Sequence, residues 1–237
     1  MYAYKYIGDT ERRNNMIKLE HTVLPSPDQM QFAIEGMRNP MNSWDNSDST
    51  IVKTDHEVDD YIDIGKTDYS LMQRLSKAGT DHRKFMRMMP VYVRITAPLY
   101  WWKEFDTYKI GTVANSCSTM HKIQEKEFTM EDFSCEHLDL LNVKPSYDIN
   151  FVSSLKEILR CLNLARDKYL ETKDKKYWWQ MIQLLPSSYN QTRNVMLNYE
   201  VLANMYHSRK NHKLDEWREF CKWIENLPYS DLIIMED

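Results

Sequence analysis

The most informative part of this chain is the stretch Ala97-Pro-Leu-Tyr-Trp-Trp-Lys-Glu-Phe-Asp-Thr-Tyr-Lys-Ile-Gly-Thr-Val-Ala-Asn-Ser-Cys-Ser-Thr-Met-His121. Apolar residues alternate just before it, at Val91, Val93 and Ile95, and this alternation predicts a strand with one buried face. Pro98 is expected to end the strand, because its nitrogen carries no hydrogen for a ladder. The short polar side chains of residues 115–119 then predict a loop that either lines a polar pocket or forms an ordinary surface turn.

Further strand and helix patterns surround this stretch. Residues 16–24 and 84–100 are predicted strands, and Ser26-Pro27-Asp28 has the capping hydroxyl, first-turn proline and early acid of a helix start. Additional helices are predicted over 69–78 (closed by Gly79), 151–165, 178–185, 195–207 and 214–224. The chain therefore reads as an α+β protein forming a single domain over 1–237, with a small antiparallel sheet, flanking helices and a helical second half.

Composition excludes several classes of protein. The 237 residues include only five glycines, at positions 8, 36, 65, 79 and 111, so neither a G-x-G-x-x-G nor a P-loop pattern occurs. A net charge of −4 is not the electrostatic footprint of a nucleic-acid binder. The four cysteines form no C-x-x-C pair, which argues against a metal site or disulfide framework. No apolar leader or membrane-length apolar run is seen, and we expect a soluble, cytoplasmic protein without a membrane partner.

The order of residues in the opening stretch resembles the signature of the flavin-dependent thymidylate synthases, a-P-x-x-x-x-R-Q-x-x-R-H-R-x-x-S-x-N-E-x-S-x-R-Y. Ala97-Pro98 matches its opening and Lys103-Glu104 stands in place of Arg-Gln. Thr107-Tyr108-Lys109 replaces Arg-His-Arg, and Asn115 and Ser118 match the Asn and Ser after one extra residue. The remaining departures are Ser116 for Glu, Met120 for Arg and His121 for Tyr.

The resemblance extends over residues 16–230. Later family motifs are L-P-x-x-x-x-T-R, an Asn, L-R and E-I-R, and this chain has in the same order Leu185-Pro186, Thr192-Arg193, Asn198, Ser208-Arg209 and Glu216-Trp217-Arg218. Upstream, residues 71–87 resemble the helix that leads to the family's G-H-x-x-P-F-E-H turn. Phe85 matches there, and Arg87 replaces the final His.

The resemblance implies a homotetramer with active sites shared between subunits. Flavin adenine dinucleotide (FAD), reduced by NADPH, would transfer a one-carbon unit from methylene-tetrahydrofolate to deoxyuridine monophosphate (dUMP). Carried over by position, the substrate-binding candidates are Arg193, Arg218, Ser118, Glu104 and Ser116, with Arg218 also the catalytic candidate. The cofactor-binding candidates are Tyr108, Lys109, Asn115, Arg209 and Arg87.

The residue types support part of this assignment and leave alternatives open. Arginine offers the planar fork that phosphates and polarised carbonyls require, whereas lysine supplies charge without that fork and Met120 supplies neither. A solvated helix surface is the simpler interpretation of any one arginine alone, and the ordered trio Arg193, Arg209 and Arg218 is what supports a binding role. Trp101 and Trp102 either stack on a ligand ring or belong to the core, and Cys117 with His121 offers a less specific nucleophile pair.

Three functions follow from these observations. The first is flavin-dependent methylation of dUMP, and the second is a relative on the same fold with a different pyrimidine nucleotide or transferred group. The third is a non-catalytic protein that keeps the fold and oligomer. The basic and aromatic residues of 173–179 suggest nucleic-acid binding, but one solvated helix face accounts for them.

Overall fold

The computed structural model describes residues 16–54, 59–138 and 150–234. The chain forms two compact units, each assembled from separate stretches of sequence. The first unit comprises Met1–Lys18, Thr96–Glu104 and Ser116–Arg193. The second comprises Leu19–Ile95, Phe105–Asn115 and Asn194–Asp237. Two long strands contribute residues to both units. The single-domain organisation over 1–237 stays a prediction.

A four-stranded sheet has the strand order β1–β4–β6–β5. The strands are β1 (Lys18–Val23), β4 (Pro90–Pro98), β6 (Asn190–Asn198) and β5 (Val113–Ser116). The two central strands, β4 and β6, are also the longest. With the helices described below, this sheet confirms the predicted α+β class.

Strand β4 has the buried face that its alternation predicts. Val91, Val93, Ile95 and Ala97 are at most 2% exposed, and the strand ends at Pro98 as expected. Burying each larger side chain of this kind contributes roughly 1.5–3 kcal/mol. The predicted strand start at residue 84 was wrong, because Arg83–Met88 forms a 3₁₀ helix (η3). Its apolar residues follow one another directly and do not alternate.

The region predicted as a helix over 195–207 divides into a strand and a helix. Strand β6 runs to Asn198, and helix α7 (Tyr199–Arg209) follows directly. Val195 and Leu197 are buried two residues apart, which is the period of a strand. The side chain of Asn198 then caps α7 by accepting a hydrogen bond from the Val201 amide at 3.0 Å.

The polar stretch 115–119 was predicted as one loop, and this was wrong in part. Asn115 and Ser116 end strand β5, whereas Thr119 begins the short helix α4 (Thr119–Lys122). The Ser118 hydroxyl caps α4 by accepting from the His121 amide at 3.2 Å. Local capping chemistry therefore explains why a serine stands at this position.

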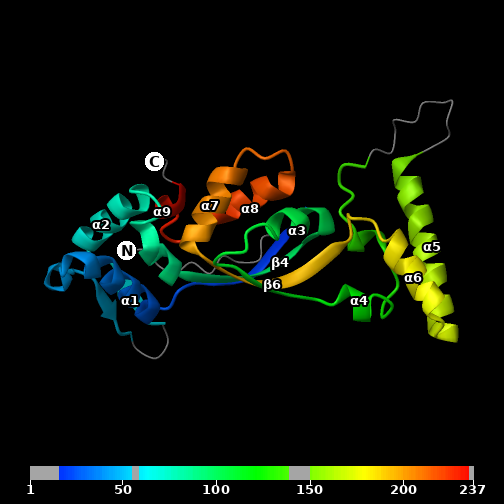
Figure 1. Cartoon of the computed structure of the whole chain (residues 1–237), viewed down its shortest axis with the longest axis horizontal. Coiled ribbons are helices and arrows are strands. Elements are labelled where there is room, and N and C mark those ends of the chain that lie inside the picture. Colours follow the sequence, from blue (N-terminus) through cyan, green and yellow to red (C-terminus); the bar gives the residue numbers. More distant parts are fainter. Residues whose placement is uncertain (1–15, 55–58, 139–149, 235–237) are drawn as a thin grey trace. The chain divides into compact units, whose positions relative to one another are not determined.

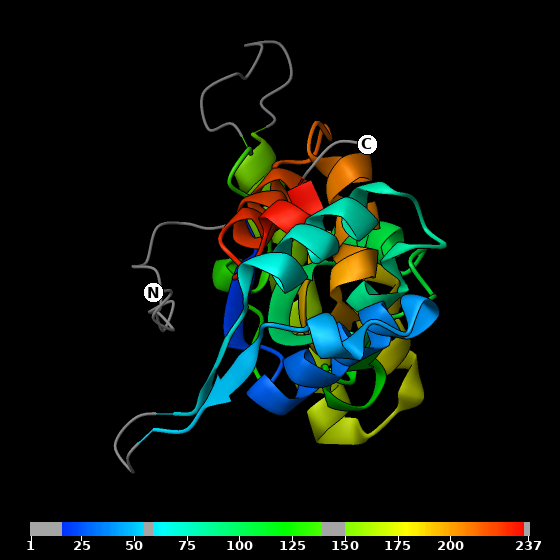
Figure 2. The same ribbon diagram turned by 90° about the vertical axis from the view of Figure 1, so that its left-hand side faces the viewer.

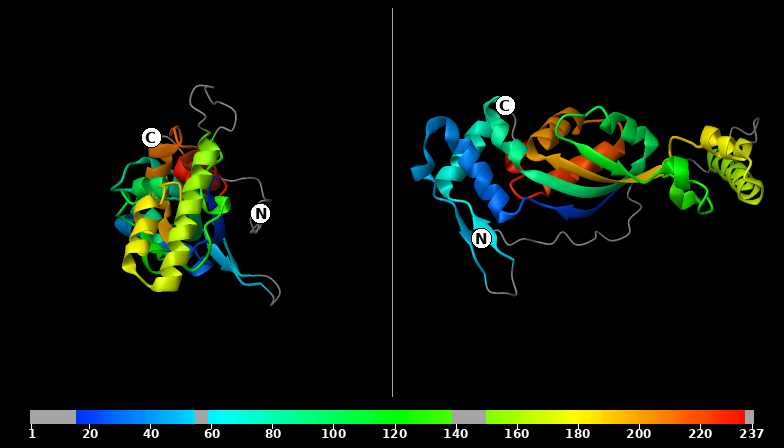
Figure 3. Two further views of the ribbon diagram at one scale, coloured as in Figure 1. Left: turned by 90° about the vertical axis from the view of Figure 1, so that its right-hand side faces the viewer. Right: turned by 60° about the horizontal axis from the view of Figure 1, so that its bottom comes forward.

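The first unit contains a pair of long helices. Helix α5 (Phe151–Thr172) packs along α6 (Lys175–Leu184), as Figures 1 and 3 show. Helix α3 (Leu99–Phe105), helix α4 and the 3₁₀ turn η4 (Met130–Asp132) are the other helical elements among its described residues. The buried core of this unit is formed by residues of α5 and α6 and of the segment between α4 and α5. They are Ile123, Phe128, Phe133, Leu155, Leu159, Leu162, Ala165 and Met181. The predicted apolar face of residues 155–165 is thus confirmed.

The second unit holds the remaining helices (Figure 2). Among the described residues they are α1 (Pro27–Arg38), η1 (Asn39–Met41), η2 (Trp44–Asn46), α2 (Lys66–Lys77), η3, α7, α8 (Asp215–Glu225) and α9 (Asp231–Ile234). Strands β2 (Thr50–Val52) and β3 (Tyr61–Asp63) pair antiparallel, with Ile51 opposite Ile62. Helix α1 starts after Ser26, as its sequence predicts, and Ser26 forms a capping box with Gln29 there.

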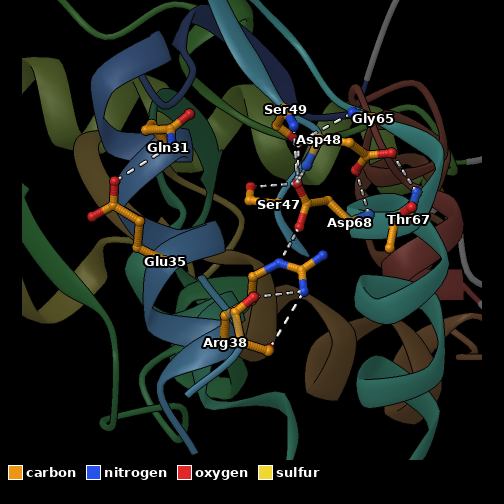
Figure 4. A network of polar contacts seen from close by, with 10 residues as sticks. Gln31, Glu35, Arg38, Ser47, Asp48, Ser49, Gly65, Thr67 and Asp68 are labelled. Atoms are coloured by element: carbon orange, nitrogen blue, oxygen red, sulfur yellow. Dashed lines mark hydrogen bonds and ion pairs between the residues drawn. The ribbon is translucent and has the colours of Figure 1, made fainter. Parts of the chain in front are cut away.

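A buried ion pair joins α1 to α2 in the second unit (Figure 4). Arg38 Nε donates to Asp68 Oδ1 at 2.6 Å, and the two side chains are 3% and 0% exposed. Asp68 Oδ2 accepts from the Ser47 hydroxyl at 2.7 Å and the Ser49 hydroxyl at 2.6 Å. Breaking such a pair leaves a buried charge uncompensated, so this network fixes the loop between the helices.

The same loop supplies the cap of α2. Asp48 accepts hydrogen bonds from the Thr67 amide at 2.9 Å and the Asp68 amide at 3.0 Å, which lowers the pKa of its carboxyl. Gly65 precedes the helix and has no side chain to do this. A Cβ at position 65 would lie 2.1 Å from Asp48 Cγ, so the close approach requires glycine.

Within the described ranges, no helix combines the length and apolarity needed to cross a bilayer.

The pKa of Asp68 makes its contribution to stability depend on pH. Burial acts to raise this pKa, but hydrogen bonds from Ser49, Ser47 and Arg38 together outweigh burial and lower it. The stabilisation from the ionised carboxylate is therefore complete above the unfolded-state pKa of about 3.9 and is lost as pH falls toward the folded-state value.

We predict that Asp68→Asn lowers the free energy of unfolding by about 3–5 kcal/mol at pH 7, because Arg38 is left buried without its counter-charge. Urea unfolding measures this loss, which should shrink below about pH 4. Asp60→Asn is the control, since Asp60 pairs with the exposed Lys53 and its removal should change little. An Asp68→Asn effect of equal size at pH 7 and pH 3 would contradict the role of the ionised carboxylate.

Candidate functional site

Arg193 is held against an aromatic ring in the first unit. It lies on strand β6, not between two helices as the sequence suggested. The carbon Cζ of its guanidinium lies 4.1 Å from the ring centroid of Trp102, which is 1% exposed and comes from α3. A cation over the face of a buried indole is attracted by the ring's quadrupole, so Trp102 orients this arginine.

Gln191 connects Arg193 to the polar stretch. Its side-chain oxygen accepts a hydrogen bond from Arg193 Nε at 2.9 Å. Its Nε2 donates to the Cys117 carbonyl and to the Thr119 hydroxyl, both at 3.0 Å. The Gln191 carbonyl in turn accepts from the indole nitrogen of Trp102 at 2.9 Å. These five residues, Trp102, Cys117, Thr119, Gln191 and Arg193, are called the Arg193 cluster below.

The strand and the polar stretch are also joined through their backbones. The Cys117 amide donates to the Thr192 carbonyl at 2.9 Å, and the Thr192 hydroxyl lies 2.7 Å from that of Thr96 on β4. Cys117 itself is exposed and takes part here through its backbone. The structure thus brings the stretch 116–119, with the predicted Ser118, next to the predicted Arg193.

The other substrate candidates of the first unit lie at its elements' ends. Glu104 is half-buried on α3, and Ser116 is exposed at the end of β5. Arg218 belongs to the second unit, where it is exposed on α8, forms an ion pair with Asp215 and donates to the His212 carbonyl at 3.3 Å. Its convergence with Arg193 stays a prediction.

Two cofactor candidates meet in the second unit. Arg209 Nε donates to the Tyr108 hydroxyl at 2.9 Å. The guanidinium lies 4.9 Å from the ring centroid of Trp217, which is fully buried on α8, and 5.6 Å from that of Tyr108. We call Tyr108, Arg209 and Trp217 the Arg209 cluster.

A small hollow lies beside Tyr108. Its volume is about 220 Å³, and it is lined by Phe105, Asp106, Tyr108, Lys109, Thr112 and Ala114. Gly111 closes the loop at φ +79°, where a Cβ would approach the Asn198 side chain to 2.8 Å. Glycine is therefore needed for the loop to lie against the start of α7.

The last two cofactor candidates have different surroundings. Asn115 is exposed on β5. Arg87 forms a two-point ion pair with Glu200 of α7, and that carboxylate raises the pKa of the guanidinium. Glu200 also faces Arg83 at 3.7 Å, so two arginines share one carboxylate at the junction of η3 and α7.

Sequence reasoning missed Gln191 and the role of the tryptophans. Gln191 stands at an unspecified position of the family motif, and nothing in its local sequence indicates that it contacts both Arg193 and Thr119. Trp102 was weighed as core or ligand stack, and it is buried while also carrying Arg193. Trp217 stands where the family has Ile, and this departure was the available indication of its contact with Arg209.

The fold with these two clusters is that of the flavin-dependent thymidylate synthases. A structure of such an enzyme from Helicobacter pylori, complexed with FAD and dUMP, aligns with a TM-score of 0.60 at 16% identity, covering 92% of this chain and 97% of that one. A second structure from the same organism, also with FAD and dUMP, gives a TM-score of 0.60 at 15% identity, covering 92% and 96%.

A related enzyme has the same fold. The UMP/dUMP methylase PolB from Streptomyces cacaoi, bound with 5-Br dUMP, aligns with a TM-score of 0.56 at 13% identity, covering 91% of this chain and 93% of that one. No protein-family model matches the sequence, and no curated protein matches it either. At these identities the similarity establishes the fold.

We predict that Tyr108→Phe lowers the free energy of unfolding by about 1.5 kcal/mol, because Arg209 loses the acceptor for its Nε hydrogen. Chemical denaturation of this variant, of Arg209→Met and of the double variant measures the coupling between the two side chains. Tyr92→Phe is the matched control, since Tyr92 is 43% exposed on β4. Purely additive losses in the cycle would show that the Tyr108 and Arg209 side chains do not interact.

Proposed function

We propose that this chain is an enzyme that methylates a pyrimidine nucleotide with a flavin cofactor. The proposed substrate is dUMP, with methylene-tetrahydrofolate as one-carbon donor and NADPH as reductant. The observation that carries the proposal is the Arg193 cluster, which fixes an arginine at the T-R position of this fold. The solved relatives with FAD and dUMP support the choice of ligands.

The chemistry of the Arg193 cluster suits a nucleotide. Phosphate and uracil carbonyl oxygens both accept hydrogen bonds from a planar, permanently charged guanidinium. An arginine held by Trp102 and Gln191 loses less side-chain entropy on binding than a mobile one. Ser118 follows the backbone-anchored Cys117, and we assign it, with Glu104 and Ser116, to the same nucleotide.

The Arg209 cluster fits part of a flavin site. Tyr108 and Lys109 line the hollow, and together they offer an aromatic face and a positive charge to a planar, phosphate-bearing cofactor. A bound flavin would supply the redox chemistry that these side chains lack. Arg209 and Lys109 would bind and orient the cofactor, with Asn115 and Arg87 as further proposed contacts.

Assembly would complete the site. The hollow of about 220 Å³ is below the roughly 300–1,000 Å³ of small-molecule sites, so one chain provides only part of the enclosure. Ile110 in the adjoining loop is 92% exposed and Val113 at the start of β5 is 60% exposed, and such apolar side chains suit burial against another subunit. We therefore propose a homotetramer with shared sites.

Missing charges favour a second candidate function. Ser116, Met120 and Thr107 replace a Glu and two Arg of the signature, and Met120 is 54% exposed on α4. Because two arginines are replaced, this chain offers a phosphate less positive charge at these positions than the family signature does. The alternative is a relative that keeps the fold and a nucleotide pocket but has another substrate or no catalysis.

We predict that Arg193→Ala weakens dUMP binding at least tenfold, because a charged partner of the nucleotide is lost. Isothermal titration calorimetry of the purified protein measures the affinity. Arg160→Ala is the control, since Arg160 is 79% exposed on α5 and pairs only with Glu157 of the same helix among the interactions described. Equal dUMP affinity in the wild type and Arg193→Ala would remove Arg193 from the nucleotide site.

We predict that the purified protein is a flavoprotein tetramer. Its absorption spectrum should show oxidised-flavin bands in the blue, and these should bleach when NADPH is added. Sedimentation at micromolar concentration should give four times the 28.5 kDa chain mass. A colourless monomer that binds dUMP would favour the second candidate function, and a colourless monomer that binds none would contradict both.

A further inference from the structure

Gln191 has every polar group of its side chain engaged within the Arg193 cluster. The oxygen accepts from Arg193 Nε, and the amide nitrogen uses its two hydrogens on the Cys117 carbonyl and the Thr119 hydroxyl. Only glutamine and asparagine carry a side-chain amide, with one acceptor oxygen and two N–H donors. Asparagine is one methylene shorter. The requirement for glutamine at this position is therefore geometric.

These contacts determine how Arg193 presents itself to a ligand. A guanidinium binds an anion at two points either side-on, through Nε and one Nη, or end-on, through both Nη. Gln191 engages Nε, and Trp102 covers one face of the plane. The side-on mode at this arginine would therefore require Nε to leave Gln191.

The amide of Gln191 also connects the polar stretch 117–119 to Arg193. Cys117 is held at its carbonyl by Gln191 and at its amide by the Thr192 carbonyl, and Thr119 is held at its hydroxyl. Ser118 stands between these two anchored residues. A displacement of the Gln191 side chain would thus move both Arg193 and the backbone around Ser118.

We propose that Gln191 is a positioning residue that sets the orientation of the Arg193 guanidinium and ties residues 117–119 to it. This inference rests on the proposed nucleotide site for the ligand, but the positioning itself is a property of the free protein. It identifies a specificity determinant at a position that the family signature leaves unspecified.

The test uses Gln191→Leu in the full-length protein, with two measurements. The first is hydrogen exchange of the Arg193 Nε–H, followed by nitrogen-15 NMR of the free protein and assigned with Arg193→Ala. The second is dUMP affinity in a cycle of Gln191→Leu, Arg193→Ala and the double variant. Gln180→Leu is the control, because Gln180 is exposed on α6 and bonds only to its own helix among the described contacts.

We expect Gln191→Leu to speed exchange of the Nε–H at least tenfold and to weaken dUMP at least fivefold. In the Arg193→Ala background the same substitution should have no further effect on dUMP. Unchanged exchange, or losses of affinity that add in the double variant, would overturn the proposal. If the wild type binds no dUMP, the proposed function fails, and the exchange rate alone still decides whether Gln191 positions Arg193.

Gln191→Glu keeps the test valid if the leucine variant does not fold. The carboxylate retains an acceptor for Arg193 Nε, so exchange of that hydrogen should stay slow. Its negative charge lies beside the guanidinium and opposite the Cys117 carbonyl, so dUMP affinity should fall at least tenfold. Fast exchange with wild-type affinity would contradict the assignment.

Discussion

The pairing of β4 with β6 at the centre of the four-stranded sheet is the constraint on which the other elements depend. Each strand buries alternate apolar residues, and each is followed at once by a helix, α3 after Pro98 and α7 after Asn198. The Thr96 and Thr192 hydroxyls, 2.7 Å apart, add a polar contact between the two strands. Because this register is fixed, Trp102 of α3 lies where it can carry Arg193 of β6. A one-residue slip would turn Arg193 to the opposite face and separate it from its indole.

Two arginines of this chain are held in the same manner. Arg193 lies over Trp102 with Gln191 at its Nε, and Arg209 lies over Trp217 with Tyr108 at its Nε. In each case a buried indole and a hydrogen-bond acceptor at Nε orient the guanidinium. The family signature contains more basic residues than the matching stretch 97–121 of this chain, where Thr107 and Met120 replace arginines. In the proposed sites, fixed orientation would compensate in part for lower positive charge, since a preorganised donor loses less entropy on binding than a mobile one.

Local patterns predicted the parts of the fold that depend on local physics. The buried face of β4, its end at Pro98, the capping box at Ser26 and the apolar face of α5 all follow from neighbouring residues in the sequence. Residues 195–198 were mispredicted as helix because two apolar residues, Val195 and Leu197, are too few to distinguish a helix from a strand. Only pairing with β4, a hundred residues away in sequence, selects the strand. Contacts of this range leave no local pattern.

The candidate site was predictable to the same extent. Ordered motifs pointed to Arg193, Arg209 and Tyr108, and the structure places the last two in direct contact. Gln191 was not predicted, because its function depends on side-chain distances to Cys117 and Thr119, more than seventy residues away. Nor did the sequence show that Arg87 is paired with Glu200. The replacement of the family's Ile by Trp217 could be interpreted only once the structure showed Arg209 against its ring.

A crystal structure of the protein with dUMP would show where the nucleotide lies relative to Arg193. We predict a nucleotide oxygen within hydrogen-bond distance of the Arg193 guanidinium, with Gln191 still bonded to Nε. A nucleotide bound elsewhere, or a saturated crystal without nucleotide at Arg193, would contradict the assignment of this cluster as the nucleotide site.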